Sequence, residues 1–345
     1  MNYNFGMSYE VTIGIPVYNV EKYVRQTLES ALSQTFQSVE FLVLDDCGTD
    51  SSMDIVRDIQ KEHPRGKDIR IITQPQNMGL GNGRNRIIKE SKGRYVFFLD
   101  SDDLLSSNAI QLMYEEAQKY DAEMIFGSME KILVYDNSQR IPCTNYSYRV
   151  FLKEDEFANW VYRKYDGIQA SSCNILIKRD IYCRNNIKYF PINYWEDFTM
   201  MMDLPSYVTR VIMLSDITYH YMCRTGSLSN YQRRERIEKD EIVQTMKAVN
   251  ILKDNSLCIK DKPYFSKRMY KLMKTCFYVC CTILRNKEII EPSFDKKELR
   301  DFMCYPVALS SVRFFRHIPL YILGKLPPSI SVQIILFMGK MKHLV

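Results

Sequence analysis

Three carboxylates stand directly behind a short apolar segment near residue 100. Residues 95–99 read Tyr-Val-Phe-Phe-Leu, which is typical of a buried strand, and Asp100, Ser101, Asp102 and Asp103 follow. Carboxylates this close repel one another, and hard divalent ions such as Mg²⁺ or Mn²⁺ bind through one or two such oxygens together with substrate phosphates. These four residues, the acidic tetrad, predict a metal-assisted diphosphate site. The alternative is that Asp102 or Asp103 only caps a following helix.

The segments around the tetrad alternate between strand and helix patterns. Apolar runs predict strands at residues 11–17, 39–44, 69–73, 95–99 and 122–127. Segments with apolar residues at helical spacing lie between these runs, which favours βαβ units. We therefore expect an α/β fold with a Rossmann-like, mostly parallel sheet flanked by helices. Ligands of such sheets bind at the carboxyl ends of the strands.

Polar or turn-forming residues follow each of the first four expected strands. They are Tyr18 and Asn19, Asp45 and Asp46, residues 76–79, and the acidic tetrad. Four such loops on one rim would enclose a nucleotide-sized crevice. Residues 79–83 are rich in glycine, but they match neither the G-x-G-x-x-G pattern nor a Walker lysine motif. A dinucleotide oxidoreductase and a P-loop kinase are thus disfavoured.

Four segments in this order resemble the successive signatures of the inverting family-two glycosyltransferases with the GT-A fold. They are residues 15–19, 44–50, 77–85 and 98–103. Order and spacing both match the family, strongly from residue 9 to about residue 130 and less closely to about residue 230. The resemblance implies transfer of a hexose-type sugar from a nucleotide donor to an acceptor hydroxyl, with inversion at the anomeric carbon.

The same resemblance implies a GT-A catalytic domain over residues 1–230. Residues 1–130 would form its nucleotide-sugar half and residues 131–230 its acceptor half. Helical spacing of apolar residues between 239 and 285 indicates that residues 231–345 form a helical C-terminal extension. The Q-x-x-R-W signature of processive polysaccharide synthases is absent, so we expect a single addition.

On the donor side, the resemblance gives roles to residues behind the first three strands. Four residues would line the base pocket: Pro16, Val17, Tyr18 and Asn19. Asp46 would accept a hydrogen bond from the imide N–H of uracil, a donor that suits a carboxylate, so UDP is the expected nucleotide. Asn77 and Gly79 belong to the loop that would contact the donor. Arg84 would either support the nucleotide or pair with a neighbouring carboxylate.

The tetrad takes the phosphate side of the donor in this resemblance. Asp100, with Ser101 beside it, would hold the ribose or a metal-bound water. Asp102 would coordinate the Mn²⁺ or Mg²⁺ that bridges the donor phosphates. Such a cation withdraws charge from the departing diphosphate, which is the Lewis-acid role of a metal in this chemistry.

Inversion by direct displacement also needs a base on the acceptor side, because a sugar hydroxyl is a poor nucleophile until its proton is taken. Residues 194–198 resemble the Glu-Asp motif of the family. Adjacent helical residues point in different directions, so we expect only one acid in the cleft. We assign Asp197 as general base, Glu196 to acceptor binding or orientation, and Trp195 to stacking on the sugar ring. The alternatives are an exposed acidic helix start and a core tryptophan.

Residues 219–229 resemble the tyrosine-rich segment that closes over the donor in this family. Arg224 and Ser227 would then grip the diphosphate. Met222 stands where relatives often carry arginine, which leaves the identity of the cationic group in this segment open. We expect His220 to be a structural hydrogen-bonding residue, since no second histidine lies at metal-ligand spacing.

The net charge of +6 is unevenly distributed along the chain. Residues 302–345 contain five Lys or Arg and no Asp or Glu, and their apolar clusters are interrupted by Pro327, Pro328 and Gln333. A basic segment with apolar clusters too short to cross a bilayer suits the headgroup region of a membrane. This predicts peripheral membrane contact. The alternative is a helical pair packed on the core of the protein itself.

Composition fits a globular cytoplasmic protein. The chain has 46% apolar residues, and its ten cysteines show no C-x-x-C spacing, so we expect reduced thiols, a cytoplasmic location and no export. Basic and aromatic residues form no recognisable nucleic-acid module. We expect a metal-dependent UDP-sugar transferase that acts at the inner membrane face on a lipid-linked or surface polysaccharide. A catalytically silent nucleotide-sugar-binding scaffold and, less favoured, a sugar nucleotidyltransferase remain the alternatives.

Overall fold

The computed structural model describes most of the 345 residues. The described residues are 9–134, 136, 138–163, 168–192, 195–224, 236–312 and 315–345. The chain divides into two compact units. The first comprises Met1–Phe157 and Ile168–Asn230, and the second comprises Ala158–Gly167 and Tyr231–Val345.

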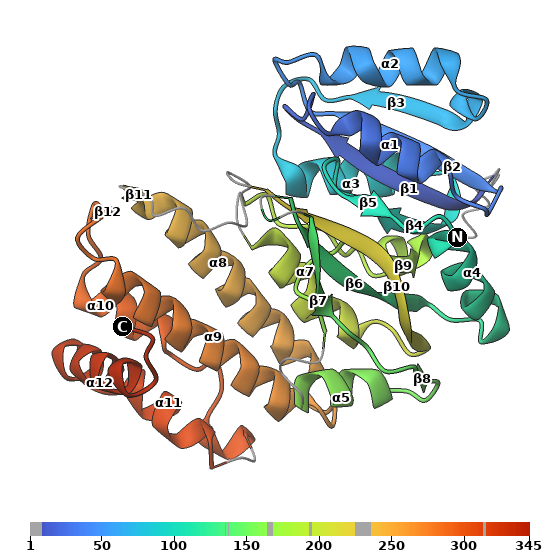
Figure 1. The fold of residues 1–345 in the computed structure, drawn as a ribbon. Helices are drawn as coiled ribbons and strands as arrows, with labels where there is room; N and C mark the ends of the chain where they lie inside the picture. Colours follow the sequence, from blue (N-terminus) through green and yellow to red (C-terminus); the bar gives the residue numbers. More distant parts are fainter. Residues whose placement is uncertain are drawn as a thin grey trace. The chain divides into compact units, whose positions relative to one another are not determined.

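A ten-stranded sheet forms the centre of the first unit, counted over the described residues (Figure 1). Its order is β3-β2-β1-β4-β9-β6-β10-β5, with β7 paired to β6 and β8 paired to β10. The strands are β1 (Tyr9–Val17), β2 (Val39–Asp45), β3 (Ile69–Thr73), β4 (Gly93–Phe98), β5 (Leu104–Leu105), β6 (Met124–Leu133), β7 (Gln139–Thr144), β8 (Arg149–Phe151), β9 (Ile175–Lys178) and β10 (Val211–Cys223).

The pairing confirms the α/β class and shows a mixed sheet. Strands β3, β2, β1 and β4 are parallel neighbours, as the sequence pattern predicts. Strand β9 runs antiparallel between β4 and β6, and β5, β7 and β8 add further antiparallel pairs. The expectation of a mostly parallel sheet therefore describes the first half of the unit. The added strands are short or partly exposed, so their sequences carry little apolar periodicity.

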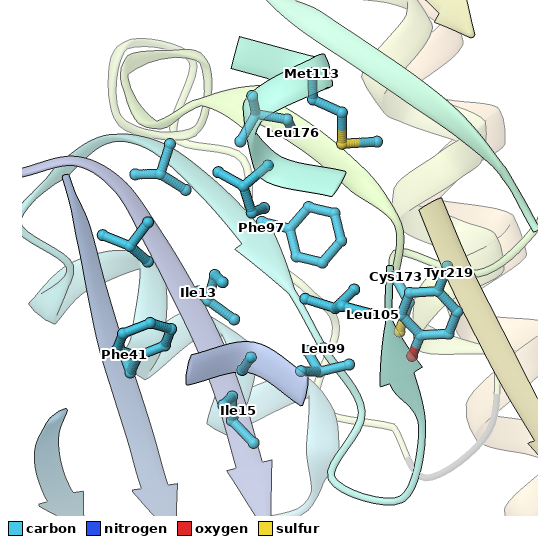
Figure 2. Close-up of a cluster of buried hydrophobic side chains, with 14 of the residues drawn as sticks. Ile13, Ile15, Phe41, Phe97, Leu99, Leu105, Met113, Cys173, Leu176 and Tyr219 are labelled. Atoms are coloured by element: carbon cyan, nitrogen blue, oxygen red, sulfur yellow. The ribbon is translucent and has the colours of Figure 1, made fainter. Parts of the chain in front are cut away.

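The parallel strands form because they are apolar along their whole length. Every residue of β2 is buried, as is typical of a strand covered on both faces. Register pairs Ile13 of β1 with Phe41 of β2 and with Phe97 of β4. Figure 2 shows these three side chains in the core cluster, together with Leu176 from β9. The core thus fixes the strand ends from which the polar loops emerge.

Seven helices in the described residues complete the first unit or its boundary. They are α1 (Val24–Leu32), α2 (Ser52–Glu62), α3 (Leu80–Glu90), α4 (Ala109–Lys119), α5 (Glu156–Arg163), α6 (Arg179–Arg184) and α7 (Glu196–Asp203). Helix α1 buries Val24, Leu28 and Ala31 at helical spacing. At the start of α2, Oδ1 of Asp50 accepts hydrogen bonds from the backbone N–H and the hydroxyl of Ser52 at 3.0 and 2.6 Å.

Five helices in the described residues build the second unit around α9. They are α8 (Lys239–Asn255), α9 (Phe265–Arg285), α10 (Lys296–Phe302), α11 (His317–Leu323) and α12 (Pro328–Met341); two short strands, β11 (Ile237–Glu238) and β12 (Ile290–Glu291), pair in parallel. Leu320, Val332 and Ile335 join the α9 residues in one buried cluster. The helical pair at the C-terminus therefore does pack on its own core. No helix in the described residues is both long enough and apolar enough to span a bilayer.

Candidate active site

The acidic tetrad lies at the carboxyl end of β4, beside the end of β1. Strands β2 and β3 extend the sheet on the other side of β1, so the chain reverses its direction of strand addition between β1 and β4. Ligands of open α/β sheets bind at such a switch point. Because β1 is a parallel neighbour of both β2 and β4, the loops after these three strands leave the sheet at this same edge.

Arg84 on α3 is the centre of this site. Its side chain is completely buried, and Nη1 donates hydrogen bonds to Oδ1 of Asp197 at 2.6 Å and to Oε1 of Glu196 at 3.1 Å. Nη2 donates to Oδ1 of Asp100 at 3.2 Å. One guanidinium thus joins the tetrad to the Glu-Asp pair on α7. Of the two sequence-based interpretations of Arg84, the structure shows the pairing with carboxylates.

Both acids of the α7 pair reach the same nitrogen of Arg84. The expectation that only one would point inward does not hold, since both occupy the first turn of α7 and the longer glutamate side chain can bend back to the guanidinium. Their exposure differs, however. The side chain of Asp197 is 22% exposed and that of Glu196 is 9% exposed. The side chain of Asp197 is therefore the more exposed of the two.

Burial and mutual repulsion shift the proton affinities of these groups. Burial and, after it, the charge of Asp197 raise the pKa of Glu196 to about 7, against the attraction of Arg84. Burial also raises the pKa of Asp197, against the attraction of Arg84. Burial alone would lower the pKa of Arg84, but Asp197 and Asp100 raise it well above its ordinary value. Arg84 is a permanent cation in this cluster.

The carboxylates of the tetrad divide into two accessible groups and one buried group. The side chains of Asp100 and Asp102 are each 34% exposed, and Oδ2 of Asp102 lies 3.1 Å from Nη1 of Arg224. Asp103 is buried: its Oδ2 accepts from the hydroxyl of Tyr219 at 2.7 Å and its Oδ1 from the backbone N–H of Met222 at 2.8 Å. Asp103 therefore anchors β10 to the tetrad.

Neither Asp102 nor Asp103 caps the helix that follows the tetrad. The N-cap position of α4 is Asn108, beyond the whole tetrad.

Burial, followed by the charge of Asp100, raises the pKa of both Asp102 and Asp103, and Arg224 opposes this at Asp102. Ser101 is buried, and its backbone carbonyl accepts from Oγ1 of Thr27 at 3.0 Å. Among the described residues, no three or more His, Cys, Asp or Glu side chains form a ready-made metal cluster.

Asp46 holds the loop that follows β3. Its Oδ1 accepts from the backbone N–H of Met78 at 2.9 Å, and its Oδ2 accepts from that of Gly79 at 3.1 Å. Gly79 has φ 79°, which favours glycine, and Oδ1 of Asn77 lies 3.1 Å from the same N–H. Sequence reasoning gave Asp46 only a base-binding role and missed this one. A carboxylate oxygen that accepts one bond retains a lone pair for another donor.

The residues after β1 are placed at the same rim. Pro16 and Val17 are still within β1, paired with Leu44 and Asp45 of β2. Tyr18 is exposed. Asn19 has φ 52°, and its Oδ1 accepts from the backbone N–H of Thr49 at 2.7 Å, so it ties the loop after β1 to the loop after β2.

The remaining predicted residues are Trp195, Arg224, His220 and Ser227. Trp195 is exposed and stacks edge-on against Phe198, with ring centroids 5.2 Å apart, so it is not a core tryptophan. The guanidinium of Arg224 lies 4.0 Å from the ring centre of Tyr23. His220 contacts Glu130 and Ser106 through its two ring nitrogens, the structural role we expected. Ser227 lies outside the described residues.

Two residues support the site without having been assigned a role from the sequence. The side-chain amide of Asn85 donates to the carbonyl of Tyr189 at 2.9 Å, and its Oδ1 accepts from the N–H of Tyr189 at 2.8 Å. The Tyr189 ring in turn lies 5.6 Å from the guanidinium of Arg84. Cys173 is buried 3.9 Å from Nη2 of Arg84. Asn85 stands beside Arg84 in the family-like segment 77–85, so the sequence could have indicated its role. Nothing in the sequence indicated a role for Cys173.

The match to a known family covers the whole of this site except its last elements. Residues 12–183 match the family model of glycosyl transferase family 2. The chain belongs to glycosyltransferase family 2. The sequence resemblance is thereby confirmed, and the protein is a glycosyltransferase. The Glu-Asp pair on α7 and β10 lie beyond the matched residues but contact Arg84 and Asp103 within them.

Known relatives agree with this assignment. The glycosyltransferase GlyG of Streptococcus pneumoniae is 25% identical over 228 residues, which cover 64% of this chain and 73% of GlyG. The UDP-Glc:alpha-D-GlcNAc-diphosphoundecaprenol beta-1,3-glucosyltransferase WfaP of Escherichia coli is 29% identical over 240 residues, which cover 68% of this chain and 86% of WfaP.

Solved structures show the same fold. Residues 1–349 of Staphylococcus aureus TarS superpose with a TM-score of 0.60 at 17% identity, covering 91% of this chain and 78% of that one. The same segment in complex with UDP-GlcNAc gives a TM-score of 0.58 at 16% identity, covering 92% and 90%. The glycosyltransferase therefore has the GT-A fold. It covers 55% of the longer TarS structure.

Proposed function

We propose that this enzyme transfers a hexose-type sugar from a UDP-sugar to a hydroxyl group of a lipid-linked or surface polysaccharide, with inversion at the anomeric carbon. The observation that carries the proposal is the contact of Arg84 with both Asp100 and Asp197. Asp100 belongs to the expected diphosphate side and Asp197 to the expected acceptor side, and the guanidinium of Arg84 joins the two. The TarS complexes with UDP and UDP-GlcNAc support the choice of donor.

We assign the acceptor-side chemistry to Asp197. Its carboxylate would take the proton of the attacking hydroxyl, and Arg84 holds that carboxylate in place and favours its charged form. Glu196, less exposed and with a pKa raised to about 7, would orient the acceptor. The exposed ring of Trp195, which precedes this pair, would stack on the sugar.

We assign the donor side to the loops after β1 to β4. Asp100 and Asp102 would hold Mn²⁺ or Mg²⁺, and their two partly exposed carboxylates fit an ion that takes its remaining ligands from water and phosphate. Such an ion, when bound, stabilises charge on the departing diphosphate. Arg224, whose Nη1 lies 3.1 Å from Oδ2 of Asp102, would add to that stabilisation. Asp46 and the β1 end would receive the base.

We place this reaction at the inner face of the cell membrane, in the cytoplasm. The support is the acceptor in the name of the E. coli relative, a diphosphoundecaprenol-linked sugar, and the basic, apolar C-terminal segment of this chain. A lipid-linked acceptor confines the reaction to a surface, where the enzyme gains from membrane contact.

The test is turnover of nucleotide sugars by the wild-type enzyme and by Asp197→Asn. Thermal shift with a panel of nucleotide sugars, with and without Mn²⁺, selects the donor; release of UDP and mass spectrometry of the product then report transfer. We expect Asp197→Asn to lower kcat by about two to four decades while donor affinity stays nearly unchanged. The matched control is Asp58→Asn, an exposed acid on α2.

Each other outcome has a defined meaning. Tight UDP-sugar binding without UDP release from any acceptor would identify a silent scaffold and contradict the proposal. Release of pyrophosphate from a nucleoside triphosphate would identify a nucleotidyltransferase. If Asp197→Asn instead loses donor binding and keeps its turnover, the base has been misassigned.

A further inference from the structure

The two C-terminal helices leave a second apolar face uncovered. Six large apolar side chains are exposed on α11, on α12 and in the turn before α11: Phe315, Ile318, Ile322, Ile330, Phe337 and Met341. We call this set the tail face. Its spacing of three, four or seven residues within each helical segment places the members of each segment on one side. The tail face belongs wholly to the second unit.

Three side chains of the tail face are more than half exposed, unlike the residues of a globular core. Phe315 is 90% exposed, Phe337 is 64% exposed and Met341 is 69% exposed. Single exposed apolar residues are ordinary, but a group of six on adjoining helices marks an interaction surface. The opposite side of the same helices is already satisfied, because Leu320, Leu323 and Ile335 are buried against the α9 cluster.

The charged side chains of residues 302–345 have a single sign. Arg316, Lys325, Lys340 and Lys342 are exposed on or beside the same helices. No Asp or Glu follows Asp301 in the chain, so nothing within this segment neutralises them. A partner for this surface must therefore accept apolar side chains and carry negative charge.

We propose that the tail face binds an anionic lipid bilayer, with its apolar side chains inserted at the headgroup level and its cations against the lipid phosphates. Interfacial helices have this combination of an apolar face with Lys and Arg. A second copy of the chain fits poorly, because pairing two tail faces would oppose like charges. A nucleic acid would match the charge but not the isoleucines. The inference deepens the proposed membrane location by naming the surface responsible.

The packing on α9 makes this a preformed surface. The helices α11 and α12 are held by buried residues, so lipid binding does not have to fold them. The same packing decides how the proposal is tested. A chain that ends near Asp301 would lose Leu320, Leu323, Val332 and Ile335 from the core, and it would report on folding as well as on lipid. Point substitutions on the exposed side avoid this problem.

The experiment is flotation of the full chain with vesicles, without any nucleotide sugar. We compare phosphatidylcholine vesicles with vesicles containing about one third phosphatidylglycerol, at low and high salt. The wild-type chain should float with the anionic vesicles and be released by salt. The double variant Phe315→Ser/Phe337→Ser should lose partitioning by about tenfold or more. Its control is Ile251→Ser, an exposed residue of α8 in the same unit.

A second pair of variants tests the charges. Lys325→Glu/Lys340→Glu should weaken partitioning by more than about twentyfold, because each basic residue near an anionic surface contributes about fivefold. The control Lys260→Glu/Lys287→Glu makes the same charge change at exposed positions elsewhere in the unit. Circular dichroism melting of every variant confirms that it folds.

Three results would overturn the proposal. The first is a wild-type chain that stays with the soluble fraction, and the second is a Phe315→Ser/Phe337→Ser variant that floats like the wild type. The third is a wild-type dimer in light scattering that this variant converts to a monomer without any vesicle binding, which would make the tail face a self-association surface. Since no donor is present, none of these results depends on the proposed transfer reaction.

Discussion

At the scale of single residues, Arg84 decides how the candidate site works. A buried guanidinium with three carboxylate partners can be removed only by leaving those carboxylates together in a poorly hydrated place. Its fork geometry also fixes their positions, which a lysine would do less well. Arg84 is therefore a positioning residue for Asp197, and its charge and its shape can be tested separately.

Two variants separate these contributions. Arg84→Lys keeps the charge and loses the fork, so we expect kcat to fall by about ten- to a hundredfold while the acidic limb of the pH profile of kcat/KM stays in place. Arg84→Met removes the charge, which further raises the pKa of Asp197, so the acidic limb should move to higher pH. An Arg84→Met profile that coincides with the wild-type limb would show that Arg84 does not act through the base.

Glu196 gives a prediction about stability. Its pKa is raised from 4.5 to about 7, so between these values the unfolded chain releases the proton before the folded one does. Stability should therefore fall as pH rises through this window and then remain level. Glu196→Gln removes this penalty, and we expect it to stabilise the protein at pH 8 by on the order of 2 kcal/mol and to have little effect near pH 4.

Thermal unfolding of Glu196→Gln at both pH values checks this directly. Glu62→Gln, an exposed position at the end of α2, provides the control. A loss of stability at pH 8 would mean that the bond between Glu196 and Arg84 outweighs the burial of the charge.

At the scale of elements, sequence patterns succeeded where strands are apolar throughout. Strands β1, β2, β3 and β4 lie where predicted, to within two residues at each end. The antiparallel strands β7, β8 and β9 were not predicted. They have only three to six residues each, and β7 and β8 are partly exposed, so no alternation of apolar and polar residues can be detected in them. The site depends on parallel and antiparallel strands alike, since Cys173, which lies just before the antiparallel strand β9, contacts Arg84.

The link between β10 and the tetrad is a second feature that motifs do not reveal. Asp103 has the same residue type and almost the same position as Asp102, yet it is buried under Tyr219 and Met222 while Asp102 is partly exposed. Only tertiary pairing distinguishes the two carboxylates. The structure therefore turns a single acidic motif into an accessible part and a structural part.

Tyr219→Phe tests the structural part. It removes the hydroxyl that donates to Asp103, leaving a buried carboxylate with one partner fewer, so we expect a loss of about 1 to 3 kcal/mol in the free energy of unfolding measured in urea. Tyr18→Phe, at an exposed tyrosine, should be nearly neutral. Equal stability of Tyr219→Phe and the wild type would show that the bond adds nothing to the fold.

At the scale of the whole molecule, charge and hydropathy of the C-terminal segment supported two interpretations. The sequence favoured membrane contact and kept packing on the core as an alternative. The structure shows that the helices have two apolar sides, so packing on one side leaves the other side available. Sequence alone could not separate these sides, because in α12 apolar residues occur almost all round the helix.

The two sides of α12 should respond differently to the same kind of truncation. Ile335 is fully buried in the α9 cluster, so Ile335→Ala should destabilise the protein by about 2 to 5 kcal/mol through lost contacts and a cavity. Phe337 lies two residues away and is 64% exposed. Phe337→Ala should therefore lower the free energy of unfolding by less than about 0.5 kcal/mol, although this substitution removes the larger side chain. Urea unfolding of the two variants compares them directly. If Phe337→Ala proves as destabilising as Ile335→Ala, the tail face is part of the core and is not free to meet a membrane.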